Sequence, residues 1–169
     1  YWGRKARDLL EAYGPAIFGV RVSQRSSAAD HWEIEGHQGM MNTAGVGGPV
    51  TGKSADLFIV DDPIKNPEEA HSKTIREKIW EWFDDVAMTR LQPNAAAIVI
   101  MTRWHKDDLA GRLERQGGWE VIRFPAVAIP GDQLGRQPGE CLWPEHYGND
   151  FYAKVRAESS AYKWAALYQ

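Results

Sequence analysis

The chain has 169 residues, 43% of them hydrophobic, which is enough to bury one hydrophobic core, so we expect a single domain over residues 1–169. The formal net charge of -3 argues against a protein whose whole surface binds nucleic acid. The single cysteine, Cys141, excludes an internal disulfide framework, and no apolar run is long enough to span a membrane, so we expect a soluble intracellular protein without a membrane partner.

The first fifty residues combine one helical pattern with short extended segments. Residues 2–13 predict an amphipathic helix that ends at Gly14 and Pro15. Residues 23–30 are mostly small and polar, which predicts a loop. Residues 31–35 alternate like an edge strand, and residues 39–44 are expected to pair with them as a β-hairpin.

The segment Gly47–Ser54 matches the phosphate-loop pattern of glycine, four residues, glycine, lysine and serine. A phosphate loop requires a preceding strand and a following helix whose amino terminus faces the phosphate. Here an apolar strand follows Ser54 almost directly, and the interval is too short for a parallel crossover. The sequence therefore favours a glycine-rich turn, and Lys53 is a candidate nucleotide ligand only if the phosphate loop is genuine.

Two apolar segments that end in polar residues are the main candidates for a functional site. Residues 57–60 are followed by Asp61 and Asp62, and residues 95–101 are followed by the segment 102–105. Apolar residues on both faces are typical of a central strand of a parallel sheet, and ligands bind beyond the carboxyl ends of such strands. We therefore expect the acidic pair and the second polar segment to face one crevice, where a metal ion and a phosphate can bind.

The segment between these two strands has the pattern of a crossover helix. Asn66 can cap it, Pro67 suits its first turn, and an apolar stripe continues to the turn at residues 92–94. The stripe consists of Ile75, Ile79, Trp82, Phe83 and Val86. Because a strand–helix–strand crossover is right-handed, both strands should end at the same edge of the sheet.

A second crossover and a C-terminal region are expected to complete the fold. Asp107 or Asp108 should open a short helix that reaches Arg115, and residues 119–124 predict a third strand. The expected fold class is α/β, with a largely parallel sheet, flanking helices and a strand–helix–strand–helix–strand core over residues 55–124. Residues 125–169 should form a long connection followed by helices near residues 151–158 and 162–167.

Several motifs in this order resemble the large subunit of tailed-bacteriophage terminase, a DNA-packaging motor with an ATPase domain followed by a nuclease domain. The resemblance covers nearly the whole chain and rests on Thr51–Asp56, Leu57–Asp62, Pro63–Asn66, Thr89–Leu91, Thr102–Gly111 and Tyr168–Gln169. It implies part of a RecA-like (ASCE-type) P-loop ATPase fold, with the family's phosphate loop upstream of Tyr1 and its nuclease carboxylates downstream of Gln169. The chain is thus expected to be an ATPase-domain fragment that is inactive by itself.

The resemblance also implies roles for individual residues. Asp61 matches the acidic residue that holds Mg²⁺, and Asp62 lies where the catalytic carboxylate orients the water that attacks ATP. Most such ATPases have glutamate at that position, so Asp62 is one methylene shorter. Thr102 matches the coupling motif that senses the γ-phosphate, and Arg103 would report the nucleotide state with it. The implied partners are double-stranded DNA, the portal protein and the terminase small subunit, in the cytoplasm of a bacterial host.

Two other functions remain open from the residues alone. A metal-dependent nuclease would use Asp61, Asp62 and His105 as ligands, although His105 also fits a capping role. A non-enzymatic DNA-binding or assembly module would use a basic stripe through Arg103, Lys106, Arg112 and Arg115, although Arg103 can equally pair with Asp107 or Asp108. An uncovered sheet edge would also permit a homo-oligomer.

Overall fold

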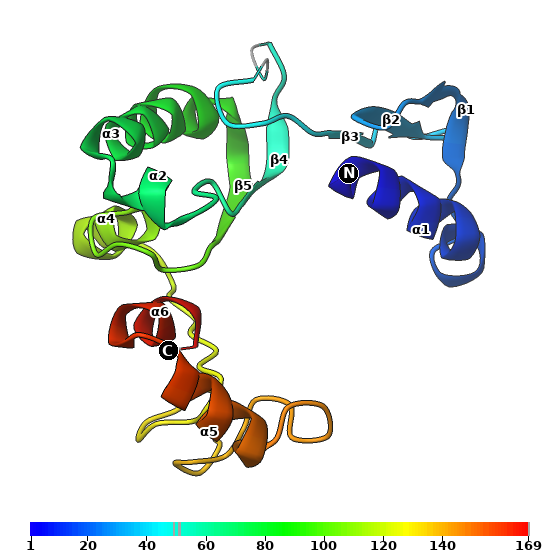
Figure 1. Ribbon diagram of the computed structural model, residues 1–169. Coiled ribbons are helices and arrows are strands. Elements are labelled where there is room, and N and C mark those ends of the chain that lie inside the picture. The colour runs from blue at the N-terminus through cyan, green and yellow to red at the C-terminus, as the bar shows by residue number, and fades with distance from the viewer. Residues whose placement is uncertain (49, 51, 169) are drawn as a thin grey trace. The chain divides into compact units, whose positions relative to one another are not determined.

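Figure 1 presents the computed structural model of the chain, which describes residues 1–48, 50 and 52–168. Pro49 and Thr51 of the phosphate-loop match, and Gln169 of the last motif, lie outside the described residues. The chain forms two compact units, residues 1–51 and residues 52–169. The single domain expected over residues 1–169 stays a prediction.

The first unit packs one helix against a three-stranded antiparallel sheet in the order β1-β2-β3. Its elements are α1 (Trp2–Ile17), β1 (Val22–Ser27), β2 (His31–Ile34) and β3 (Met40–Asn42). The indole Nε1 of Trp32 donates a hydrogen bond to the carbonyl oxygen of Gly3, at 3.1 Å. A side chain at Gly3 would collide with the carbonyl oxygen of Ala29, so glycine permits the close approach of helix and loop.

The structure confirms the hairpin predicted in this unit and corrects two other predictions. The hairpin is confirmed as β2 and β3, with Trp32 opposite Met41. The loop predicted at residues 23–30 is wrong, because β1 occupies residues 22–27 and pairs with β2. A strand whose side chains are largely exposed can consist mostly of polar residues, so the polar composition of this segment did not indicate a strand. The helix also continues past Gly14 and includes Pro15 in its last turns.

The second unit is built on two parallel strands, β4 (Ala55–Asp61) and β5 (Leu91–Ile100). In their register Ile59 lies opposite Ile98, and Asp61 lies opposite Ile100. This mixed α/β arrangement confirms the predicted fold class at that level. The turn predicted at residues 92–94 is wrong, since these residues form an irregularity within β5 where Asn94 has a positive φ of 68°.

The crossover between β4 and β5 is helical but is not one continuous helix. Extended backbone at Ser72, with ψ of 109°, separates two α-helices, and the Ser72 side chain caps the second by accepting a hydrogen bond from the amide of Ile75. The segments in order are α2 (Pro67–His71), α3 (Lys73–Glu81), the π-helical turn η1 (Trp82–Ala87) and the 3₁₀ turn η2 (Met88–Arg90). Asn66 caps α2, as the sequence predicts.

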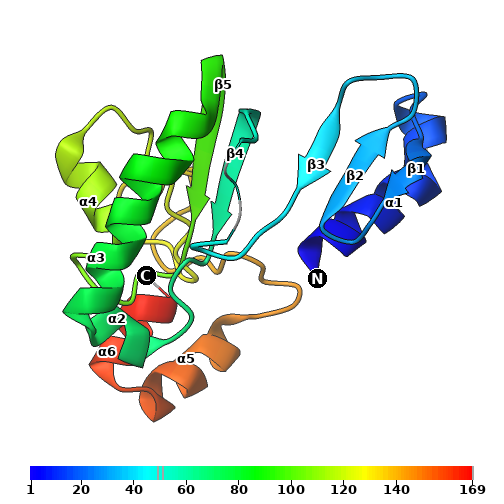
Figure 2. The ribbon, with the colours of Figure 1, turned by 90° about the horizontal axis from the view of Figure 1, so that it is seen from above.

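The helices cover one face of the sheet formed by β4 and β5. Val60 on β4 packs with Ile79 and Phe83 in a core that continues to α4 (Leu109–Gln116). In Figures 1 and 2, α3 and α4 lie on the same side of the two strands. Leu57, Ile59, Ile98 and Ile100 point to the opposite face, where each side chain is at least 43% exposed. Within the described residues β4 and β5 pair only with each other, so neither is the central strand that the apolar pattern predicts.

The strand predicted at residues 119–124 does not form. Trp119 still packs against Phe83, with ring centroids 6.0 Å apart, but no ladder joins this segment to the sheet. Instead, the side-chain amide of Gln133 accepts from the amide of Arg123 and donates to the carbonyl oxygen of Val121. The Gln133 side chain therefore forms hydrogen bonds with this backbone in place of a neighbouring strand. The sheet consequently has two described strands.

The C-terminal helices are confirmed as α5 (Asn149–Glu158) and α6 (Ala161–Leu167). They enclose a second small core in which Tyr152 and Trp164 contact each other edge-to-face, with Ala126 and Cys141 buried beside them. None of the helices in the described part of the chain is both long enough and apolar enough to cross a bilayer.

Candidate site at the carboxyl ends of β4 and β5

The carboxyl ends of the two parallel strands bring Asp62 and Thr102 into direct contact. The amide of Asp62 donates to the carbonyl oxygen of Ile100, at 2.9 Å. The Oδ1 atom of Asp62 accepts a hydrogen bond from the amide of Thr102, also at 2.9 Å. The two polar segments therefore meet at one edge of the sheet, as the crossover geometry predicts.

The backbone of Asp62 has an unfavourable conformation. Its φ is 40°, in the left-handed region that few residues other than glycine adopt. Such a conformation costs on the order of 1 kcal/mol and persists where neighbouring contacts enforce it. Here the two hydrogen bonds to the end of β5 enforce it, so the Asp62 carboxylate is held at the sheet edge.

Asp61 is the last residue of β4, and its side chain is exposed. No hydrogen bond or ion pair engages its carboxylate among the residues that the structure describes. No group of three or more His, Cys, Asp or Glu side chains in that part of the chain is arranged to hold a metal ion. The sheet edge therefore supplies carboxylate oxygens but no complete metal cage.

Arg103 extends away from the acidic pair toward α4. Its Nε lies 3.2 Å from Oδ2 of Asp108, which is fully buried, and its Nη1 lies 2.6 Å from Oε1 of Glu114. Of the two pairings predicted for Arg103, the structure forms the one with Asp108. Oδ1 of Asp108 accepts from the amide of Gly111, so this carboxylate also caps α4.

Gly111 is required by the tight contact between α4 and the segment that precedes it. A side chain at this position would overlap the carbonyl oxygen of Lys106 and lie 2.9 Å from Nη2 of Arg103. The absence of a Cβ lets the segment 103–106 lie directly on the first turn of α4. This packing fixes the segment that begins at Thr102.

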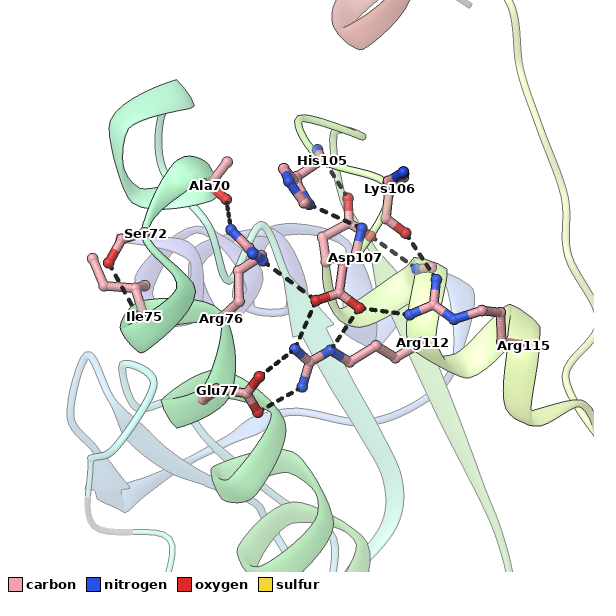
Figure 3. Close-up of polar contacts among 12 residues, drawn as sticks. Ala70, Ser72, Ile75, Arg76, Glu77, His105, Lys106, Asp107, Arg112 and Arg115 are labelled. Atoms are coloured by element: carbon pink, nitrogen blue, oxygen red, sulfur yellow. Dashed lines mark hydrogen bonds and ion pairs between the residues drawn. The ribbon is translucent and has the colours of Figure 1, made fainter.

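An ion-pair network anchors the same segment to α3 (Figure 3). The carboxylate of Asp107 lies 2.9 Å from Nη2 of Arg112, 2.6 Å from Nη2 of Arg115 and 3.6 Å from Nε of Arg76. Arg112 also binds both carboxylate oxygens of Glu77, at 2.9 and 3.0 Å. Glu77 and Arg76 lie on α3, so the network joins α3, α4 and the site segment.

The network shifts the titration of both carboxylates. The hydrogen bond from Arg112 is the main cause that lowers the pKa of Asp107, and Arg115 lowers it further. Arg112 likewise lowers the pKa of Glu77. Of the predicted basic stripe, Arg103, Arg112 and Arg115 are committed to these internal ion pairs. Sequence reasoning missed the network because α3 and α4 are far apart in the chain and no local motif connects them.

His105 has a local structural contact. Its Nδ1 accepts a hydrogen bond from the amide of Asp107, at 3.0 Å, so the neutral ring carries its proton on Nε2. Burial and the nearby Arg76 lower the pKa of His105. The hydroxyl of Tyr162 on α6 donates to the carbonyl oxygen of Trp104, at 2.7 Å. Helix α6 therefore contacts the site segment as well.

The phosphate-loop match at Gly47–Ser54 lacks the required following helix. β4 begins at Ala55, directly after Ser54. Gly47 and Gly52 have φ of 77° and 76°, which glycine adopts without strain. The described part of this segment therefore has the backbone of a glycine-rich turn that enters a strand, as the sequence favours.

The fold and the site together define an α/β protein with acidic and hydroxyl groups at the carboxyl edge of a parallel strand pair. The sequence profile of the T4likevirus-type terminase large subunit, N-terminal, matches residues 4–169. The chain is also 28% identical, over 109 residues, to the terminase large subunit of Enterobacteria phage T3; this match covers 64% of the chain and 18% of that relative. The chain belongs to the terminase large subunit family. It spans less than a fifth of the relative that it matches.

Proposed function

We propose that the chain is part of the ATPase motor of a phage terminase large subunit, which hydrolyses ATP with Mg²⁺ to translocate double-stranded DNA into a procapsid. The observation that carries the proposal is the hydrogen bond between Oδ1 of Asp62 and the amide of Thr102. It joins the candidate catalytic carboxylate directly to the candidate nucleotide sensor. Membership of the terminase family supports the proposal.

Mg²⁺ fits Asp61 by its donor chemistry. Mg²⁺ takes oxygen ligands and is usually held by one or two carboxylates together with substrate phosphates, rather than by a cage made only of protein groups. Asp61 presents an exposed carboxylate at the sheet edge. A bound Mg²⁺ would neutralise charge on the β- and γ-phosphates of ATP. Asp61 would hold it there, within a fold of the RecA-like type.

Asp62 and Thr102 would perform the steps that depend on the nucleotide. Oδ1 of Asp62 is engaged by Thr102, which leaves Oδ2 as the acceptor that can orient water. Because the contact on Thr102 is through its backbone amide, a change at Asp62 acts directly on the segment 102–108. Arg103 would transmit that change to α4 through Asp108 and Glu114.

The proposed partners follow from this role. They are double-stranded DNA, the portal protein and the terminase small subunit, in the cytoplasm of a host bacterium, with further copies of the large subunit as possible neighbours. The nuclease alternative has less support, because His105 and the acidic pair do not form a metal-binding group among the described residues. The DNA-binding alternative loses three cations of its stripe to internal ion pairs.

The test uses the intact large subunit that contains this chain. We expect Asp61→Asn to weaken Mg²⁺-dependent ATP binding, ATP hydrolysis and DNA packaging together, because the metal loses a charged ligand. Asp56→Asn is the matched control, since Asp56 is exposed on the same strand but remote from its carboxyl end. Normal ATP hydrolysis by Asp61→Asn, or an equal loss in Asp56→Asn, would refute the proposed function.

A further inference from the structure

The segment that leads into α5 carries a continuous exposed aromatic surface. Its members are Leu142, Trp143, His146, Tyr147 and Phe151. Ring centroids are 4.9 Å apart for Trp143 and His146, 4.3 Å for His146 and Tyr147, and 4.8 Å for Tyr147 and Phe151. Trp143 is 58% exposed, Phe151 43% and Tyr147 38%, so the rings contact each other and solvent at once.

The size of this aromatic surface is that of an interaction site. A large aromatic side chain has roughly 150–250 Å² of surface. The exposed parts of Trp143, Tyr147 and Phe151, together with that of Leu142, which is 41% exposed, therefore add up to on the order of 300–400 Å² of apolar area. The largest apolar patch on a monomeric protein is commonly of this size and is often functional. Aromatic residues also dominate the binding energy of protein interfaces.

The backbone beneath the aromatic surface is held in place before any partner binds. The amide of Leu142 donates to the carbonyl oxygen of Ala126, and the amide of Tyr147 donates to that of Trp143, each at 2.8 Å. Sγ of Cys141 donates to Oδ1 of Asn149, at 2.9 Å. Little conformational entropy therefore remains to be lost when a partner docks, which favours binding.

The charge around the aromatic surface selects the partner. Residues 137–154 include three exposed acidic residues, Glu140, Glu145 and Asp150, and one exposed basic residue, Lys154, so the segment carries more negative than positive charge. Nucleic-acid phosphates would be repelled here, whereas arginine guanidinium groups pair with carboxylates and stack on aromatic faces. The same unit contains such a contact, with the guanidinium of Arg156 lying 5.2 Å from the ring centroid of Trp164.

We propose that this aromatic surface is the docking site for a partner protein segment that combines arginine side chains with apolar anchors. The anchors would pack on Trp143 and Phe151, and the guanidinium groups would lie against Glu145 and Asp150. The site is independent of the acidic pair at the sheet edge and requires neither ATP nor Mg²⁺.

The experiment measures binding of short fluorescent peptides to the full chain by anisotropy. The probe peptide is rich in arginine and leucine; one matched peptide has glutamate in place of each arginine, and another has serine in place of each leucine. We expect the arginine–leucine peptide to bind at least about tenfold more tightly than either matched peptide and than a duplex DNA of similar length. Trp143→Ala and Phe151→Ala should each weaken it by about tenfold or more.

Two further variants separate docking from folding. Glu145→Lys reverses one exposed charge, so it should weaken the arginine–leucine peptide while leaving the thermal unfolding midpoint unchanged. Phe18→Ala removes an aromatic ring that is 68% exposed in the first unit and should leave binding unchanged. The proposal is overturned by equal binding of the three peptides, by preferential binding of DNA, or by normal binding in both Trp143→Ala and Glu145→Lys. It is also overturned if sedimentation shows that Trp143→Ala abolishes self-association, since the occupant would then be a second copy.

Discussion

Asp62 combines a strained backbone with a specific side-chain contact. Its positive φ is maintained by hydrogen bonds of its amide and its carboxylate to the end of β5. Non-glycine residues in such conformations concentrate at ligand-binding and catalytic sites. Neighbouring Asp61 has a regular strand conformation and an exposed carboxylate, so the two acids of the pair differ in both geometry and contacts.

Asp62→Asn tests the role of this carboxylate in the intact large subunit. Asparagine can still accept the amide of Thr102, so the local backbone should be retained, but it cannot act as a base toward water. We expect ATP binding to be preserved and steady-state hydrolysis to fall by on the order of a hundredfold or more. Asp62→Glu should retain activity if the site accepts one more methylene. Near-normal turnover by Asp62→Asn would remove Asp62 from the catalytic role.

Gly111→Ala tests the contact between the site segment and α4. The new methyl group would overlap the carbonyl oxygen of Lys106, which cannot move without displacing the backbone. We expect a loss of on the order of 2 kcal/mol in the free energy of unfolding, measured by urea denaturation. Gly45→Ala is the control, because Gly45 has no atom within 4 Å of the new methyl position. Equal stability of the two variants would show that the segment can shift freely.

At the scale of elements, ion pairs and a hydrogen bond connect α3, α4 and α6 to the segment that follows β5. Asp107 is the centre of the ion pairs, and Tyr162 provides the contact from α6. The pairs are partly exposed, so salt will screen them. These ion pairs fix which surfaces of the helices meet, because Asp107 is shared between Arg112 and Arg115, and Arg112 also pairs with Glu77 on α3.

Asp107→Asn should make the stability of the folded chain less sensitive to acid. The pKa of Asp107 is lowered in the folded chain, so its contribution to stability is complete above the unfolded carboxyl pKa of about 4 and is lost as pH falls below it. We expect the variant to lose roughly 1 kcal/mol in the free energy of unfolding at pH 7 and to show a smaller further loss at pH 3 than the parent chain.

Urea unfolding at the two pH values measures this difference between variant and parent. Asp84→Asn is the control, because Asp84 is exposed and its charge lies outside the network. If Asp107→Asn loses stability equally at both pH values, the effect of Asp107 comes from packing rather than from its charge.

At the scale of the whole molecule, the second unit leaves one face of its sheet exposed. Leu57, Ile59, Ile98 and Ile100 form this face, and the two described strands have no further neighbour in the sheet. The phosphate-loop pattern at Gly47–Ser54 leads into β4 rather than into a helix. In the proposed ATPase, Asp61 would hold the metal ion and Asp62 would orient the attacking water, and neither residue would bind the phosphates directly.

The chain of residues 1–169 should accordingly show little or no ATP hydrolysis by itself. We expect no Mg²⁺-dependent phosphate release above that of the Asp62→Asn variant of the same chain, measured with a coupled phosphate assay. The intact large subunit, assayed in parallel, provides the positive control. Turnover by the chain comparable to that of the intact protein would mean that Lys53 and its glycine-rich turn bind phosphate after all.

Local sequence signals predicted the elements whose formation depends on neighbouring residues. Asn66 and Asp108 accept hydrogen bonds from amides three residues ahead, as expected for helix caps, and both helices begin where these residues predict. The apolar runs predicted β4 and the main part of β5. The crossover pattern predicted that Asp62 and Thr102 lie at one edge. The chemical roles of these residues stay predictions.

Other features were decided by contacts between segments that are distant in the chain. Residues 119–124 have the composition of a strand, yet Gln133 takes their hydrogen bonds, and no local pattern indicates that choice. Arg103 had two possible acidic partners, and burial of Asp108 against α4 selected one. The sequence by itself determined which residues carry the candidate chemistry and on which strand ends they lie. The tertiary structure alone decided which of their charges are paired, because pairing depends on how helices far apart in sequence pack together.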